Sequence, residues 1–380
     1  MVKKSFLLIA LFLIFVVVSP RQATSAPKQA APPAAATVPV QPGWKAEWNK
    51  TVAAAKQEGK VVIFATVVKN TQNDLINAFV KEFGIQPEFR IMSGAEFATQ
   101  VSTKRRAGIF TTDLFMGGMT TPYTQFKPTG ILNPLKDLLI LPEVTDAGKW
   151  YNNRIPFLDK DNTILAFGAV TQSYITINTD MVKASEITGY RDLIDPKWKG
   201  QIVINDPTIA GRGLDWFQVM DKIMGPDYVA KLLAQEPVVT RDRRIQAEWV
   251  ARGKYPLGIA LDTSAVQAFI KNKAPIRFIW PKEGVMISAE KGGLAVFKPA
   301  PHPNAARVFA NWLLTKEAQT IWSRDEGLQS GRTDVPVDFL PSDQVRDPNK
   351  KYDSMDHEDW YISKNKYKEQ ATQTFSHFIK

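Results

Sequence analysis

The stretch 166–215 constrains the fold of this chain most, because two apolar strand patterns in it lead through small residues directly into a helix. β-Branched and aromatic residues predict a strand over 170–177 and another over 201–205. The second strand is followed by Asp-Pro-Thr-Ile-Ala-Gly-Arg-Gly at 206–213 and by a helical pattern from about Leu214. The first backbone N–H groups of such a helix have no intrahelical partner, so this turn is suited to hold an anion. We interpret the strand over 170–177 as the point where the chain crosses from one lobe to another.

The same order of strand, small residues and helix recurs along the chain. Short apolar runs predict strands at 61–66, 87–92, 113–116, 201–205, 237–240 and 257–261, with helical patterns between them, and further strands at 275–280 and 294–297. This order predicts an α/β fold with parallel sheets. Ligands of such sheets bind beyond the carboxyl ends of the strands.

In the first half of the chain, this rule selects four residues that follow predicted strands as candidate ligand contacts: Thr66, Ser93, Gly118 and Thr120. Taken singly, each is equally well explained as a turn or cap residue. Taken together, they form a set of strand ends at one edge of a sheet, and we expect a binding site there.

The N-terminus has the pattern of a secretory signal. Lys3 and Lys4 precede an apolar run over 6–18 and a small-residue stretch that ends at Ala26. We therefore expect a cleaved signal peptide at 1–26, cut after Ser25 or Ala26, in preference to a membrane anchor, since the apolar run is short for a membrane span. Residues 27–43 are a Pro/Ala-rich tether. The mature protein is expected not to be embedded in a membrane.

Composition narrows the class of protein further. A hydrophobic content of 44% with 23% charged residues is typical of a soluble globular chain, and residues 44–380 are long enough for two lobes. The chain has no cysteine, which excludes disulfides, thiolate metal sites and a lipid-modified N-terminal cysteine. An exported, unanchored protein of this kind is expected in a periplasm. The net charge of +10 comes without a compact basic run interleaved with aromatics, so we expect a basic surface and no nucleic-acid partner.

The region after the predicted strand at 294–297 carries a family resemblance. The segment KPAPHPNAARVFANWLLTKEAQ at 298–319 is followed by Gly-Arg-Thr-Asp-Val at 331–335. Together with Pro-Lys-Trp-Lys-Gly at 196–200 and Ala-Arg-Gly-Lys-Tyr-Pro-Leu-Gly-Ile-Ala at 251–260, these segments resemble periplasmic extracellular solute-binding proteins of ATP-driven (ABC) importers, the group that includes the ferric-ion-binding proteins. The resemblance covers about residues 44–335.

The resemblance implies a periplasmic binding protein of type II, with two α/β lobes joined by two crossing strands and the ligand clamped between them. Lobe 1 would contain 44–168 and 288–336, and lobe 2 would contain 169–287. The C-terminal extension at 337–380 lies beyond the resemblance, and we expect it to wrap around the outside. The expected partners are a small solute and an ABC permease with its ATPase, and the protein is expected to be a monomer without a cofactor.

The resemblance also bears on metal binding. In ferric-binding relatives, two adjacent tyrosines bind the metal at the end of the strand that matches 257–261, where this chain has Thr263-Ser264. Neutral hydroxyls bind a hard trivalent ion poorly. The three histidines, His302, His357 and His377, all lie late in the chain. We therefore predict no metal site and keep ferric-iron transport as an alternative.

An anion clamp is the central site prediction. In the ferric-binding relatives the corresponding turn holds an anion, and here the clamp would consist of Thr208, Ala210, Gly211 and Arg212. Backbone N–H groups, a hydroxyl and a guanidinium suit a carboxylate or a phosphate. The predicted ligand is thus a small anionic solute. A surface ion pair is the equally weighted alternative for Arg212.

The remaining candidates are less specific. Tyr174 on the crossing strand either contacts the ligand or packs in the hinge, and Thr263 and Ser264 are further candidate contacts of lobe 2. Asp262 before them is expected to cap a helix. The run over 241–244, which includes Asp242 and Arg243 and faces the cleft with Thr240, is interpreted as a solvated face.

Two other classes of function remain open. An exported enzyme is disfavoured because the chain has no G-x-S-x-G or H-E-x-x-H motif and no metal-spaced histidine cluster. A sensory protein that presents its solute to a membrane receptor has the same sequence features as a transport protein.

Overall fold

The computed structural model describes residues 42–92 and 94–379. The predicted signal peptide, the predicted tether up to residue 41, and Ser93 lie outside the described residues. Within the described part of the chain no helix is long and apolar enough to cross a membrane.

The first lobe is built on a five-stranded sheet with the order β2-β1-β3-β12-β4 among the described residues. Its strands are β1 (Lys60–Ala65), β2 (Gln86–Ile91), β3 (Leu114–Gly117), β4 (Leu165–Ala166) and β12 (Gly293–Val296). β1 pairs in parallel with β2 and β3, as the sequence predicts. β12 runs antiparallel to both β3 and β4, so the expectation of an all-parallel sheet is wrong here. The reason is that β12 belongs to the chain returning from the second lobe.

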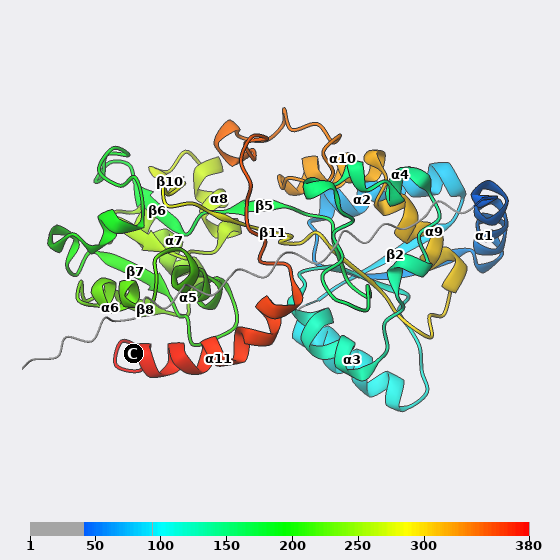
Figure 1. Cartoon of the computed structure of the whole chain (residues 1–380), viewed down its shortest axis with the longest axis horizontal. Helices are drawn as coiled ribbons and strands as arrows, with labels where there is room; N and C mark the ends of the chain where they lie inside the picture. Colours follow the sequence, from blue (N-terminus) through cyan, green and yellow to red (C-terminus); the bar gives the residue numbers. More distant parts are fainter. Residues whose placement is uncertain (1–41, 93, 380) are drawn as a thin grey trace, which may run out of the picture. The chain divides into compact units, whose positions relative to one another are not determined.

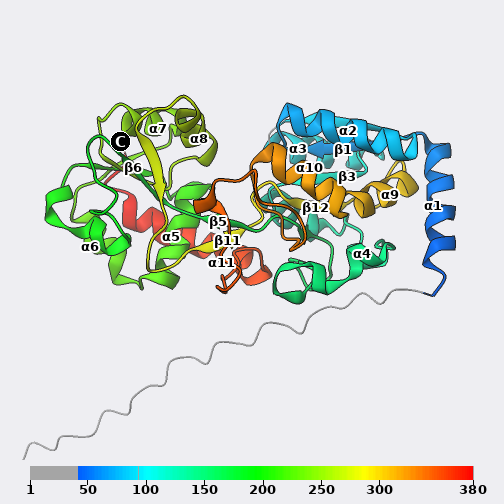
Figure 2. The ribbon, with the colours of Figure 1, turned by 90° about the horizontal axis from the view of Figure 1, so that it is seen from above.

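Helices cover this sheet (Figure 2), and their apolar faces pack on it in two clusters, of which the one with α3 continues into the second lobe. They are α1 (Trp44–Glu58), α2 (Lys69–Phe83), α3 (Gly94–Arg106), α4 (Pro142–Thr145), α9 (Pro303–Leu313) and α10 (Lys316–Glu326). Phe79 on α2 has its ring centroid 5.0 Å from that of Phe309 and 5.1 Å from that of Trp312 on α9. These contacts join segments that are more than 200 residues apart in the sequence, and burial of the rings makes the lobe one core.

The second lobe is built on another five-stranded sheet, with the order β10-β6-β9-β7-β8 among the described residues. Its strands are β6 (Ile175–Asn178), β7 (Ile202–Asn205), β8 (Val238–Thr240), β9 (Leu257–Ile259) and β10 (Ile276–Ile279). β7 is parallel to β8 and β9, whereas β6 is antiparallel to β9 and β10. The carboxyl ends of β7, β8 and β9 therefore meet at one edge.

Each of these three parallel strands leads into a helix. The helices of this lobe are α5 (Arg212–Ile223), α6 (Asp227–Leu233), α7 (Arg243–Ala251) and α8 (Thr263–Lys271). The Asp262 carboxylate accepts a hydrogen bond from the N–H of Ala265 at 2.9 Å, which confirms the predicted helix cap. Asp242 caps α7 in the same way.

The crossing point differs from the prediction. The single strand expected over 170–177 is two strands, β5 (Val170–Gln172) and β6, which belong to different sheets. β5 pairs with β11 (Met286–Ser288) in a two-stranded antiparallel ribbon. We call this ribbon the hinge ribbon. It lies at the predicted lobe boundaries near 168 and 288, and the exact boundaries stay a prediction.

The C-terminal extension lies along the outside and buries one face against the rest of the protein. Residue 354 pairs with residue 287 of the hinge ribbon, and α11 (Glu358–Phe375) runs beside α5 (Figure 1). Trp360 of α11 is 1% exposed, so the extension is part of the core. Its aromatic residues supply the apolar surface that this packing requires.

Short helical turns connect the main elements. The structure has a π-helical turn η1 (Pro122–Phe126) and the 3-10 turns η2 (Lys127–Thr129), η3 (Leu135–Asp137), η4 (Ala147–Lys149), η5 (Tyr151–Asn153), η6 (Tyr190–Ile194), η7 (Pro196–Trp198) and η8 (Ser342–Gln344).

Candidate functional site

The turn between β7 and α5 has the backbone geometry that the sequence predicts, and two glycines make it possible. Gly211 adopts φ 146° and ψ −166°, a region that is essentially restricted to glycine. A Cβ on Gly213 would lie 2.4 Å from the carbonyl oxygen of Asn205, so only glycine allows α5 to start this close to β7. The start of α5 is therefore held against the edge where the parallel strands end.

One backbone N–H group of this turn already has a neutral hydrogen-bond partner. The N–H of Gly213 donates to Oδ1 of Asn205 at 3.1 Å, and Gly211 provides no side-chain cap. Ala210 is exposed and Gly211 is half-buried. The start of α5 is thus open to an acceptor from outside, as an anion site requires.

The N–H and hydroxyl of Thr208 are less available to a ligand than the sequence suggests. Its N–H and its hydroxyl both donate to Oδ1 of Asp206, at 2.8 and 2.7 Å. The other carboxylate oxygen of Asp206 accepts from Nε of Arg241 at 2.6 Å. Because the hydroxyl proton of Thr208 is already donated, in this conformation the hydroxyl can only accept from a ligand.

Arg212 contacts the hinge segment. Its Nη1 donates to Oε1 of Gln172 at 2.7 Å, and its Nη2 donates to the carbonyl oxygen of Ser173 at 2.6 Å. Nη1 also lies 3.3 Å from Oε1 of Glu290. These partners are mostly uncharged and partly buried, so neither the free clamp nor the simple surface ion pair describes Arg212. Ligand contact by Arg212 stays a prediction that requires these bonds to rearrange.

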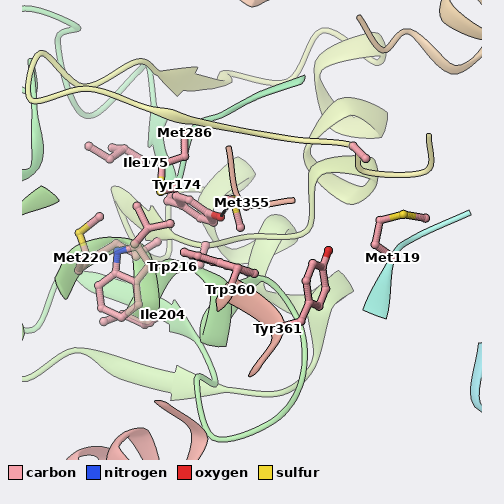
Figure 3. Close-up of a cluster of buried hydrophobic side chains, with 14 of the residues drawn as sticks. Met119, Tyr174, Ile175, Ile204, Trp216, Met220, Met286, Met355, Trp360 and Tyr361 are labelled. Carbon is pink, nitrogen blue, oxygen red and sulfur yellow. Dashed lines mark hydrogen bonds between the residues drawn. The ribbon is translucent and has the colours of Figure 1, made fainter. Parts of the chain in front are cut away.

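Tyr174 packs in the hinge core. Its ring lies under the guanidinium of Arg212, 4.9 Å from ring centroid to Cζ, and its hydroxyl points toward Met355, with Oη 3.5 Å from Sδ (Figure 3). The side chain is 2% exposed, and burial raises the pKa of its hydroxyl well above the usual value. Tyr174 therefore acts in this conformation as a neutral packing residue.

Arg243 places an exposed cation beside the start of α5, whereas the sequence predicts that it faces the cleft within a run interpreted as a solvated face. Its Nη2 lies 3.6 Å from the position that a Cβ on Gly211 would take, and its Nη1 lies 3.9 Å from Oδ2 of Asp262. Its side chain is 60% exposed. Arg243 thus lies between the starts of α5 and α8, beside the half-buried Thr263 and the exposed Ser264. The position of the run over 241–244 directly after β8, next to β7, is the signal that identifies it.

In the first lobe, the structure brings Thr66 and Gly118 to one edge of the sheet. β1 is next to β3, and the N–H of Thr66 donates to the carbonyl oxygen of Met116 at 3.1 Å. Both residues are half-buried, and Thr120 nearby is exposed. Ser93 lies outside the described residues. None of these side chains carries a charge.

The start of α2 in this lobe already holds a carboxylate. Oε1 of Glu326 accepts from the N–H of Val68 and from the hydroxyl of Thr71, each at 2.7 Å, and Oε2 lies 3.0 Å from Nζ of Lys291. The Glu326 side chain is fully buried. An internal anion therefore occupies the position that a ligand anion would otherwise take.

The donor groups do not form an evident metal centre. No group of three or more His, Asp or Glu side chains arranged to hold a metal occurs within 42–92 and 94–379. Nδ1 of His302 lies 2.9 Å from Oδ2 of Asp113, and Nδ1 of His357 accepts from the N–H of Trp360 at 3.2 Å. Burial lowers the pKa of His357, so it is a neutral helix cap.

Comparison with known proteins identifies a family and a relative. The family model described as bacterial extracellular solute-binding protein matches residues 74–352. An uncharacterized protein of Haemophilus influenzae is 25% identical over 307 residues, 78% of this chain and 84% of that protein.

Solved structures share the fold. The Trichodesmium protein IdiA (FutA) in complex with iron and citrate has a TM-score of 0.62 at 19% identity, over 84% of this chain and 99% of that one. The periplasmic binding protein AfuA of Actinobacillus pleuropneumoniae, with exogenous fructose-6-phosphate bound, has a TM-score of 0.60 at 20% identity. The match covers 84% of this chain and 99% of AfuA. At these identities the likeness shows the type II fold with its two lobes.

Proposed function

We propose that this chain, which belongs to the bacterial extracellular solute-binding proteins, is the periplasmic binding component of an ABC importer and carries a small anionic solute between its two lobes. The solute carries a carboxylate or a phosphate. The protein hands it to a membrane permease that is driven by an ATPase, and it performs no chemistry on it.

The observation that carries the anion assignment is that no carboxylate caps the start of α5, where the neutral amide of Asn205 accepts from the N–H of Gly213. The other two helices that follow the parallel strands of the second lobe, α7 and α8, are capped by the carboxylates of Asp242 and Asp262. α5 starts at Gly211 without a side-chain cap, and the exposed guanidinium of Arg243 lies beside it. Unpaired N–H groups together with a guanidinium form strong, directional bonds to oxyanions.

Two structural relatives are consistent with this class of solute. Citrate bound with iron in IdiA and fructose-6-phosphate bound in AfuA are both oxyanions. We transfer only this shared chemistry to the present chain, because the identities are 19% and 20%.

Ferric iron is the second candidate, since IdiA binds iron together with its anion. Here the strand β9 is followed by Thr263 and Ser264 in place of phenolic residues. Iron would therefore need most of its ligands from the accompanying anion, for example as a citrate complex.

A thermal-shift screen of the purified protein tests the proposal. Phosphate, citrate, sugar phosphates and dicarboxylates are compared with polyamines and with ferric ion, the latter with and without citrate. A solute at 100 times its dissociation constant stabilises the folded protein by about 2.7 kcal/mol. We expect stabilisation by an anion alone. Stabilisation only by polyamines or by ferric ion without an anion would contradict the proposal, and turnover of the bound solute would contradict the non-enzymatic assignment.

A further inference from the structure

The C-terminal helix α11 is attached to the second lobe along α5. Nε2 of Gln218 donates to Oγ of Ser363 at 2.9 Å and to the carbonyl oxygen of Trp360 at 3.1 Å. Further along, the hydroxyl of Tyr367 donates to the carboxylate of Asp221 at 2.6 Å. These bonds, together with the contacts of the Phe375 ring with Trp216 and Phe217, fix one face of α11 to this lobe.

The first turn of α11 is also attached to the first lobe. The rings of Tyr361 and Tyr123 lie 5.1 Å apart. The carboxylate of Glu358 accepts from the N–H of Lys160 at 3.3 Å and lies 3.6 Å from Nζ of Lys127. The helix therefore spans from one lobe to the other.

The hinge ribbon fixes where α11 begins. The N–H of Met355 donates to the carbonyl oxygen of Ile287 at 2.8 Å. The buried carboxylate of Asp356 accepts from the N–H of Ala289 and, at 3.0 Å, from the hydroxyl of Tyr361. Figure 3 shows Met355, Trp360 and Tyr361 of the extension among the buried residues of this region. Side chains in the first two turns of α11 thus have fixed positions relative to the hinge.

One of these side chains joins the two predicted halves of the binding site. Nζ of Lys364 lies 2.9 Å from Oδ1 of Asp215, in the first turn of α5. It also lies 3.5 Å from Oγ1 of Thr120, a candidate contact of the first lobe. The Lys364 side chain is 14% exposed, and its ammonium lies 5.0 Å from the ring centroid of Tyr361. A cation is therefore held between the start of α5 and a strand end of the opposite lobe.

We infer that Lys364 is a solute-binding cation of the cleft, supplied by the C-terminal extension and not by either lobe. This inference rests on the proposed function. Arg212 directs its guanidinium at the hinge segment, so Lys364 takes the place of the cation that the sequence assigned to Arg212. An ammonium group has three N–H donors. Among the described residues, Oγ1 of Thr120 accepts from one of them at 3.5 Å, whereas Asp215 forms a close ion pair in which its Oδ1 does not accept a hydrogen bond. A remaining N–H group can donate to an oxygen of the solute.

The test is a neutral replacement that keeps the length of the side chain. Lys364→Met retains the alkyl contact with Tyr361 and removes the charge. For the anion that stabilises the wild-type protein most in the thermal-shift screen, we expect calorimetry to show a loss of affinity of about 10- to 50-fold, as for the loss of one charge-assisted hydrogen bond. Lys366→Met, at an exposed position of the same helix, is the matched control and is expected to bind like the wild type. Melting curves without solute establish that both variants are folded.

The outcomes separate this inference from the proposed function. Unchanged or tighter binding by Lys364→Met would overturn the inference, because tighter binding would mean that Lys364 blocks the cleft. An equal loss in Lys366→Met would also overturn it, since the effect would then be one of net charge. If the wild-type protein binds no anion at all, the proposed function itself fails. Asp215→Asn is expected to change the affinity in the opposite direction. It frees Lys364 from its ion pair, so the anion is expected to bind more tightly.

Discussion

The starts of α2 and α5 follow parallel strands in the two lobes, but they are satisfied in opposite ways. At α2 the buried carboxylate of Glu326 accepts from Val68 and Thr71 and pairs with Lys291. At α5 the partner is the neutral amide of Asn205. The helix dipole attracts an anion to both positions, but only one of them is already filled.

This difference predicts separate tasks for the two lobes. The first lobe presents the uncharged residues Thr66, Gly118 and Thr120 after its strands. The second lobe and the C-terminal extension bring Arg243 and Lys364 to the start of α5. Recognition of the solute's charge is therefore expected from the second lobe and the extension.

The largest effect is expected from removal of the internal anion of the first lobe. Glu326→Ala leaves Lys291 and the start of α2 without a partner, and we expect the free energy of unfolding to fall by about 3 to 5 kcal/mol. Urea unfolding measures this. Glu317→Ala, at an exposed position of the same helix, is the control and is expected to change stability by less than about 0.5 kcal/mol. A loss below about 1 kcal/mol in Glu326→Ala would mean that the carboxylate is not structural.

The extension contributes a second buried carboxylate, that of Asp356, whose effect on stability depends on pH. Burial raises the pKa of Asp356 to about 6, although the N–H of Ala289 and the hydroxyl of Tyr361 oppose the shift. Since the folded-state pKa lies above the unfolded value of 3.8, the folded protein binds the proton more tightly. Asp356 therefore costs stability as pH rises from about 4 to about 6, by on the order of 3 kcal/mol.

Asp356→Asn removes this titration. The difference in unfolding free energy, wild type minus variant, is expected to increase as pH is lowered from 7 to 4. Parallel urea titrations of both proteins at four pH values measure the difference. A difference that does not change with pH would show that Asp356 keeps an ordinary pKa in the folded protein.

Arg243→Ala tests the charge assigned to the second lobe. Affinity for the bound anion is expected to fall by about tenfold, the effect of one charge-assisted contact, and the melting temperature without solute is expected to stay unchanged because the side chain is 60% exposed. Arg252→Ala, another exposed arginine at the end of α7, is the control in the same calorimetric titration. Equal affinities for both variants would remove Arg243 from the site.

The smallest change is expected in the stability of the protein, when the aspartate caps of α7 and α8 are removed. Asp262→Ala is expected to cost about 1 kcal/mol of stability through loss of the cap on α8, and Asp242→Ala a similar amount on α7. Neither change should weaken anion binding, because each removes a negative charge near the site. Weaker binding in either variant would show that a cap residue contacts the solute.

Local patterns predicted most of the fold. The apolar runs located β1, β2, β7 and β9 to within one or two residues, and Asp262 was recognised as a cap. The two-residue strand β4 and the split between β5 and β6 were missed, because such short strands have no periodicity of their own. The sheet partners of β12 depend on the path of the whole chain.

The candidate site was predictable only in part, because some of its contacts join residues that are far apart in the sequence. The Gly211 turn follows from local sequence, since few residues other than glycine adopt its backbone angles. The contact between Val68 and Glu326 joins residues 258 positions apart, and that between Thr120 and Lys364 joins residues 244 positions apart. Contacts of this kind leave no trace in spacing or composition.

Hydrogen–deuterium exchange of the protein with and without its anion tests whether the start of α5 recognises the charge of the solute. If the solute's charge is recognised at the start of α5, backbone amides at 209–215 are protected on binding and those at the start of α2, 68–72, change little. Protection at the start of α2 without protection at the start of α5 would contradict the account.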